Sequence, residues 1–237
     1  MLDIFLVFVV FLIIVYIFVE VYFKKPLESI FFKAIASLGF IILGSIAIIE
    51  RMNQNLLDIS LLDLLPGAIL FLLGLVCGLI GDILLALRPL RDVRDDKKII
   101  ISGIASFSLG HLFYMTGLIY FSNFNYLSIV FGVFMTLVIY FGSIWLKFEM
   151  GIARIPSLVY TFLIFTMVGQ AISMGFQFEF HTFSTLLSIG AILFAVSDLI
   201  LAPIYFKGEK SDMLVIANLS TYYAAQLFIA ISLFYII

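Results

Sequence analysis

The chain has 237 residues, of which 64% are hydrophobic and only 12% are charged, and its mean hydropathy is +1.25. A water-soluble domain carries about 25% charged residues because its surface must be solvated, so this composition excludes a soluble globular protein. The net charge of -2 argues against a nucleic-acid partner, which requires a clustered basic face. The solvent of this chain is therefore expected to be lipid.

Apolar runs between charged and turn residues predict eight membrane-spanning helices, each needing roughly 20 apolar residues. An all-α membrane protein with a single transmembrane domain over 1–237 follows, with no room for a soluble domain. The first run lacks a basic segment and a cleavage motif, so we interpret it as a retained span. A lone cysteine, Cys77, excludes an intrachain disulfide. The expected spans are about 4–22, 30–49, 64–86, 99–120, 126–146, 155–174, 183–204 and 213–235.

Lysine and arginine fall almost entirely on one side of these spans, twelve residues against Arg51 alone on the other. The positive-inside rule places the twelve in the cytoplasm and both termini outside it. Trp145 beside Lys147 fits an interfacial anchor at the inner face. Rich use of Ile, Phe and Lys indicates a bacterial inner membrane. The twelve are Lys24, Lys25, Lys33, Arg88, Arg91, Arg94, Lys97, Lys98, Lys147, Arg154, Lys207 and Lys210.

The two halves of the chain resemble each other. GDILLA at 81–86 matches SDLILA at 197–202, and Pro26 and Pro156 each lie near the start of an even-numbered span. An offset of four spans preserves orientation, which predicts two parallel four-helix repeats about an axis along the membrane normal. A chance match within a low-complexity apolar alphabet is the alternative.

Asp82 and Asp198 lie well inside spans, whereas the other thirteen acidic residues lie at span ends or in loops. With a rise of about 1.5 Å per residue, they sit roughly 9 to 14 Å below the inner interface, which Arg88 and Lys207 mark. A carboxylate at that depth costs at least ~2.5 kcal/mol, so an acid there indicates a functional site. Stripes of small residues beside both acids favour close helix approach. Alternatively, each acid is a structural hydrogen-bond partner.

Further polar side chains occur within the spans. His111 lies in the span over 99–120 and is expected within reach of Asp82, because the spans 64–86 and 99–120 are consecutive. These side chains form either the wall of a site or polar contacts between helices. Only two histidines exist, His111 and His181, so a three-histidine zinc site cannot be assembled. We predict no metal or cofactor, and an Asp-dominated metal site is the alternative. The others are Tyr114, Tyr160, Tyr222, Tyr223 and Gln226.

Six motifs follow one another along nearly the whole chain: Lys25-Pro26, GLIGDILLA at 78–86, GHLFY at 110–114, RIPSLVYTFLIFTM at 154–167, GAILFAVSDLILA at 190–202 and TYYAAQ at 221–226. Together they resemble the lysoplasmalogenase (YhhN-like) family of multi-spanning membrane hydrolases. The resemblance implies hydrolysis of the vinyl ether of a lysoplasmalogen, which yields a fatty aldehyde and glycerophosphoethanolamine or glycerophosphocholine. It also implies that Asp82 and Asp198 are the essential acids; bacterial members with other lipid substrates are an alternative.

The chemistry of a vinyl ether fits two buried carboxyl groups. Protonation of the double-bond carbon remote from oxygen produces an oxocarbenium ion, which water captures. One of Asp82 and Asp198 is expected to deliver the proton and the other, ionised, to stabilise the cation, in an order that the sequence leaves open. A lysophospholipid and the surrounding membrane lipid are the expected partners. The substrate-binding set is predicted as Lys25, His111, Tyr114, Tyr160, Tyr222, Tyr223 and Gln226.

Two other classes of function fit the same residues. Paired membrane acids in parallel repeats also suit a proton-coupled transporter of a lipid or small metabolite. A lipid-binding or scaffolding protein with structural acids is the third possibility. Release of aldehyde by purified protein distinguishes the hydrolase from both.

Overall fold

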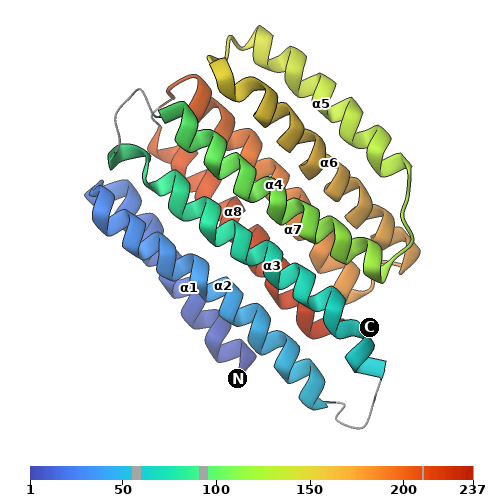
Figure 1. The fold of residues 1–237 in the computed structure, drawn as a ribbon. Coiled ribbons are helices and arrows are strands. Elements are labelled where there is room, and N and C mark those ends of the chain that lie inside the picture. The colour runs from blue at the N-terminus through green and yellow to red at the C-terminus, as the bar shows by residue number, and fades with distance from the viewer. Residues whose placement is uncertain (55–59, 91–95, 210, 237) are drawn as a thin grey trace.

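The computed structural model describes residues 1–54, 60–90, 96–209 and 211–236. Within these ranges all regular secondary structure is helical, with eight helices long and apolar enough to cross a membrane (Figure 1). The predicted all-α architecture is confirmed, and the chain is a multi-pass membrane protein. The helices are α1 (Leu2–Phe18), α2 (Pro26–Gln54), α3 (Ser60–Ala86), α4 (Asp96–Phe121), α5 (Leu127–Trp145), α6 (Arg154–Gln177), α7 (Thr182–Phe206) and α8 (Asp212–Ser232).

The second span is longer at both ends than expected, and its largest departure is at its end, where α2 continues to Gln54 instead of stopping at 49. The structure extends α1 by a π-helical turn, η1 (Val19–Phe23), and begins α2 at Pro26, four residues before the expected start. Lys24, with φ of 52°, ends the turn in the left-handed conformation. Counting apolar residues stops at the first charge, whereas a helix continues until its backbone pattern breaks, here at Lys24 and Pro26.

The helices pack as four hairpins, α1 with α2, α3 with α4, α5 with α6 and α7 with α8. Contacts of α2 with α3 and with α8 have counterparts four helices on, in α6 with α7 and with α4. This is the packing expected of two four-helix repeats. Helix α5 lies at one edge of the bundle beside α6 (Figure 1). The repeat places α3 and α7, which carry Asp82 and Asp198, in equivalent positions.

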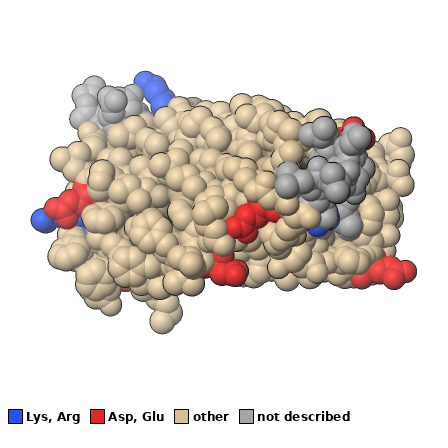
Figure 2. All heavy atoms as spheres, turned by 90° about the horizontal axis from the view of Figure 1, so that it is seen from below, with Lys and Arg blue, Asp and Glu red and all other residues tan. Residues whose placement is uncertain are grey.

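Both chain ends lie at one end of the bundle, as an even number of spans requires. The N-terminal amino group is 3.2 Å from Glu50 Oε1, and Arg51 Nε donates to the Ile236 carbonyl at 2.9 Å. On the face drawn in Figure 2, most of the surface is uncharged. The described residues of the predicted cytoplasmic set lie toward the opposite end. Three members of that set, Arg91, Arg94 and Lys210, lie outside the described residues.

A glycine on α3 allows a close contact with α4. A Cβ atom at Gly74 would lie 2.2 Å from the ring of Tyr114 in α4, so we expect Gly74→Ala to lower the free energy of unfolding by about 1 to 3 kcal/mol. Gly142→Ala is the matched control, because nothing lies within 4 Å of that position. Thermal unfolding in detergent measures both. Equal melting temperatures for the two variants would contradict the close packing of α3 against α4.

Candidate active site

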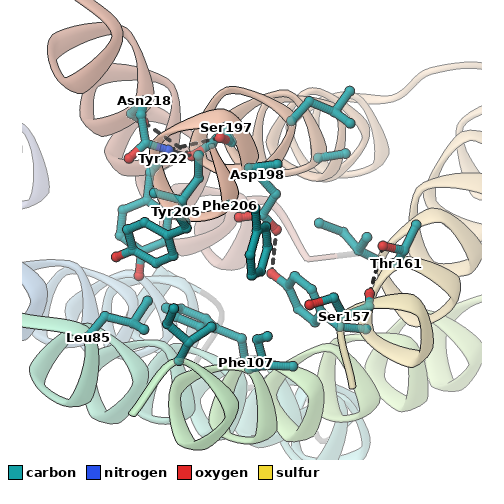
Figure 3. Close-up of a pocket in the computed structure, with 18 of the residues that line it drawn as sticks. Leu85, Phe107, Ser157, Thr161, Ser197, Asp198, Tyr205, Phe206, Asn218 and Tyr222 are labelled. Carbon is teal, nitrogen blue, oxygen red and sulfur yellow. Dashed lines mark hydrogen bonds between the residues drawn. The ribbon is translucent and has the colours of Figure 1, made fainter. Parts of the chain in front are cut away.

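Asp82 of α3 and Asp198 of α7 line the same cavity, which has a volume of about 140 Å³. We call this cavity the chamber. Tyr222 and Phe107 are among its other walls (Figure 3). Most of its lining is apolar, so the two carboxyl groups share a water-poor space. The apolar lining includes Leu85, Ile104, Phe107, Ile139, Ile164, Phe165, Leu199 and Phe206.

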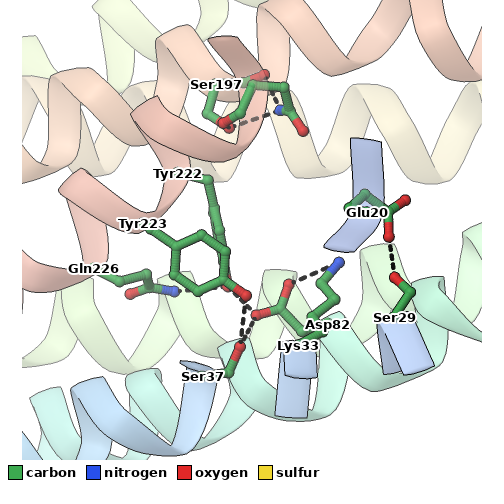
Figure 4. A network of polar contacts seen from close by, with 10 residues as sticks. Glu20, Ser29, Lys33, Ser37, Asp82, Ser197, Tyr222, Tyr223 and Gln226 are labelled. Carbon is green, nitrogen blue, oxygen red and sulfur yellow. Dashed lines mark hydrogen bonds and ion pairs between the residues drawn. The ribbon is translucent and has the colours of Figure 1, made fainter. Parts of the chain in front are cut away.

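Asp82 is surrounded by donors that stabilise a carboxylate (Figure 4). Its Oδ2 accepts hydrogen bonds from Ser37 Oγ at 2.6 Å and Tyr222 OH at 2.8 Å. The Lys33 ammonium is 3.3 Å from Oδ1, and both partners of this ion pair are buried. A buried charge requires such a partner together with hydrogen bonds. The geometry therefore favours Asp82 in its ionised form.

Asp198 has a different environment. Tyr160 of α6 donates a hydrogen bond to Asp198 Oδ2, and His111 Nε2 lies 3.2 Å from the same Tyr160 hydroxyl. His111 Nδ1 lies 3.3 Å from Met167 Sδ. Among the described residues, no ion pair to Asp198 is formed. The described contacts of both His111 ring nitrogens are therefore with α6, which packs against α4, and no hydrogen bond from His111 to Asp82 is among them.

Four predicted substrate-binding residues, His111 and three others on α4 and α8, are not among the described residues that line the chamber. Tyr114 OH donates to Gln226 Oε1 at 3.0 Å, and Gln226 Nε2 donates to Tyr222 OH at 3.1 Å. Tyr223 OH lies 3.2 Å from Ser37 Oγ. Tyr114, Gln226 and Tyr223 are thus placed to orient the two hydroxyl groups that bind Asp82. Of the predicted set, Tyr160 and Tyr222 line the chamber itself.

A second, larger cavity of about 720 Å³ adjoins the chamber, and we call it the vestibule. Lys33, Leu85 and Tyr205 line both cavities. Lys25, the remaining predicted site residue, lies at the vestibule with its ammonium 2.9 Å from Glu28 Oε1. The charged residues of the vestibule are Glu20, Lys24, Lys25, Lys33, Arg88, Asp96, Glu209 and Asp212.

Sequence reasoning missed three residues of this site. Lys33 was counted only as a basic residue at the start of a span, yet Lys33 and Ser37 lie one helical turn apart on the face of α2 that meets Asp82. That i, i+4 spacing was the available signal. Ser157 lines the chamber, and its buried Oγ has no hydrogen-bond partner among the described residues. A hydroxyl in that state can bind a polar atom of a ligand or water.

The fold and the chamber together define a polytopic α-helical membrane protein with two acids in one buried cavity. The chain belongs to the YhhN family, the family of lysoplasmalogenase-like proteins, whose model matches residues 31–233. No curated protein and no solved structure matches the chain.

Proposed function

We propose that the protein is a lysoplasmalogenase-like hydrolase that cleaves the vinyl ether bond of a lysoplasmalogen. The products are a fatty aldehyde and a glycerophospho-headgroup such as glycerophosphoethanolamine or glycerophosphocholine. One observation carries the proposal: Asp82 and Asp198, from separate halves of the chain, line a single apolar cavity. Membership of the YhhN family supports it.

Asp198 is assigned the role of general acid. It lies without a cationic partner among the described residues, in apolar surroundings that favour the neutral carboxylic acid. Its proton passes to the double-bond carbon remote from the ether oxygen, and the electron pair of the double bond forms the new C–H bond. The other carbon becomes an oxocarbenium ion. Tyr160, held by His111, donates to Oδ2 and stabilises the carboxylate that remains.

Asp82 is assigned the complementary role, because Lys33, Ser37 and Tyr222 hold it as a carboxylate. Its negative charge stabilises the oxocarbenium ion across a water-poor cavity, where electrostatic interactions are strong. Water then adds to the cationic carbon while a proton leaves to a carboxylate. The protonated carboxyl then gives its proton to the glycerol oxygen of the hemiacetal as that C–O bond breaks, and a carboxylate takes the proton of the hemiacetal hydroxyl, so that the aldehyde and the glycerol hydroxyl are released. The overall reaction consumes one water and leaves one carboxyl protonated and one ionised, as at the start.

The orientation in the membrane is also part of the proposal. The vestibule lies at the end of the bundle where the described lysines and arginines concentrate, and the positive-inside rule assigns that end to the cytoplasm. Both termini then lie outside the cytoplasm. The membrane is proposed to be a bacterial inner membrane. Accessibility of single cysteines introduced at positions 3 and 147 to a membrane-impermeant thiol reagent measures the two sides.

The function is tested with full-length protein purified in detergent and incubated with a lysoplasmalogen. Release of fatty aldehyde, detected as a hydrazone, supports the hydrolase. The proton-coupled carrier remains the alternative because two membrane acids also suit a proton relay. Proton-driven lipid transport in proteoliposomes, with no release of aldehyde, would contradict the hydrolase and support the carrier.

A further inference from the structure

The vestibule is a charged cavity that shares lining residues with the apolar chamber. Helix ends meet around it: α2 begins at Lys25-Pro26, α3 ends near Arg88, and α8 begins at Asp212. Its cations are already paired with carboxylates, Lys24 with Asp212 at 2.9 Å and Arg88 with Asp96 at 2.7 Å. The headgroup of a bound lipid, held in the vestibule by its tail in the chamber, can replace the carboxylates as the partner of these cations.

Lys33 is the charged residue at the boundary between the two cavities. It lines both of them, and its side chain contacts Asp82 at the chamber side. The ion pair uses only Oδ1 of Asp82, whereas the two hydroxyl donors hold Oδ2. Asp82 therefore keeps partners when Lys33 also contacts a ligand. The ammonium has three donors, which allows it to contact a carboxylate and a second anion together.

We propose that Lys33 determines specificity by binding the phosphate of a lipid headgroup seated in the vestibule while it remains next to Asp82. This inference rests on the proposed function of the same site. A phosphate at Lys33 places the glycerol linkage of a one-tailed lipid at the boundary beside Asp82 and its tail in the chamber. Lys33 thus positions the scissile bond between the two acids, and Lys25 at the vestibule supplies a second cation for the headgroup.

The experiment compares two vinyl ethers with the same chain, a 1-alkenyl lysophosphoethanolamine and a 1-alkenylglycerol that lacks phosphate. We expect the wild-type kcat/KM to be higher for the phosphate-bearing lipid by about 10- to 100-fold, the worth of a hydrogen bond to a charged group. Lys33→Met should bring the ratio of the two values close to one, and Lys33→Arg should keep most of the preference. If both substrates lose the same factor in Lys33→Met, Lys33 is only structural and the inference is wrong.

A binding measurement separates this inference from the proposed function. Saturated 1-alkyl analogues contain no vinyl ether, so their affinities in detergent are measured by titration calorimetry without turnover. Lys33→Met should weaken binding of the phosphate-bearing analogue by about 10-fold and leave 1-alkylglycerol unaffected. Equal losses would overturn the headgroup assignment even if aldehyde is released. If neither vinyl ether yields aldehyde, the proposed function is wrong. The binding of the two alkyl analogues to the wild type and to Lys33→Met still tests the role of Lys33.

Three further variants and one competitor complete the test. If Lys33→Met does not fold, Lys33→Gln replaces it, because an amide can still donate to Asp82 without the charge. Lys25→Gln should reduce the phosphate preference by a smaller factor, whereas Lys147→Gln, an exposed lysine outside both cavities, should not change it. Inorganic phosphate at millimolar concentration should not displace the alkyl lysophospholipid. Displacement would define a free-phosphate site and overturn the headgroup assignment.

Discussion

Replacing Asp198 by Asn is expected to reduce aldehyde release from a lysoplasmalogen by about 10³-fold, within the range that general acid catalysis contributes. An amide has the shape of the carboxyl group but no acidic proton to deliver to the double-bond carbon. Tyr160 can still donate to the amide oxygen, so the variant should fold. Aldehyde release and the melting temperature are measured on the same detergent-purified sample.

Asp3→Asn is the control for this variant. Asp3 is exposed in the first turn of α1, away from both cavities, and its loss should change neither aldehyde release nor the melting temperature. Full activity of Asp198→Asn would remove Asp198 from the chemistry. A variant that loses activity only together with its folded structure would instead give Asp198 a structural role.

Asp82→Asn is expected to change both catalysis and stability. The substitution removes the negative charge that stabilises the oxocarbenium ion, and it leaves the Lys33 ammonium buried without its counter-ion. Breaking a buried ion pair in this way costs about 3 to 5 kcal/mol in the free energy of unfolding. The expected result is therefore an inactive protein with a clearly lower melting temperature than the wild type.

The double variant Asp82→Asn/Lys33→Met separates these two effects. Removing the unpaired charge should restore much of the lost stability, because replacing both partners of a buried pair by uncharged groups is often neutral. Aldehyde release should stay absent. A double variant less stable than Asp82→Asn, measured by thermal unfolding, would contradict the ion pair. Activity in the double variant would show that the Asp82 carboxylate is dispensable.

The positions of the helices and of the two acids were predictable because each depends on sequence spacing alone. A run of about 20 apolar residues defines a span, and a carboxylate within it marks a point where the chain accepts a large desolvation cost. The matching GDILLA and SDLILA segments added that both acids lie at equivalent depth. Neither the positions of the helices nor the depths of the two acids depend on how one helix is rotated against another, so both can be predicted from the sequence.

The partners of each acid were not predictable, because they depend on which helices cross between the halves. Chain order favoured contact between Asp82 and His111 of the following helix. Instead, α4 packs on α6 as α8 packs on α2. His111 therefore contacts Tyr160, which donates to Asp198, while Tyr222 donates to Asp82. The pairing of Lys33 with Asp82 was also not predictable, because a lysine near the start of a span has the same sequence pattern as a lysine at the membrane interface.

Periodicity also identified buried polar residues without separating those that line a cavity from those behind its wall. Tyr222 and Gln226 are one turn apart on α8, and both are buried. Only Tyr222 contacts Asp82, whereas Gln226 contacts the Tyr222 hydroxyl. The distinction arises from the approach of α3, where a Cβ at Gly78 would lie 2.7 Å from Gln226 Nε2. A close approach of that kind is visible only in three dimensions.

Hydrolysis in isotopically labelled water is the most direct test of the proposed protonation at carbon. In D₂O, the purified protein should release an aldehyde carrying one deuterium on the carbon next to the carbonyl, observed by mass spectrometry after immediate reduction to the alcohol. In H₂¹⁸O, the glycerophospho-product should contain no ¹⁸O, because water adds to the cationic carbon of the alkenyl chain. An aldehyde without deuterium at that carbon, or ¹⁸O in the glycerol hydroxyl, would contradict acid catalysis by the two aspartates.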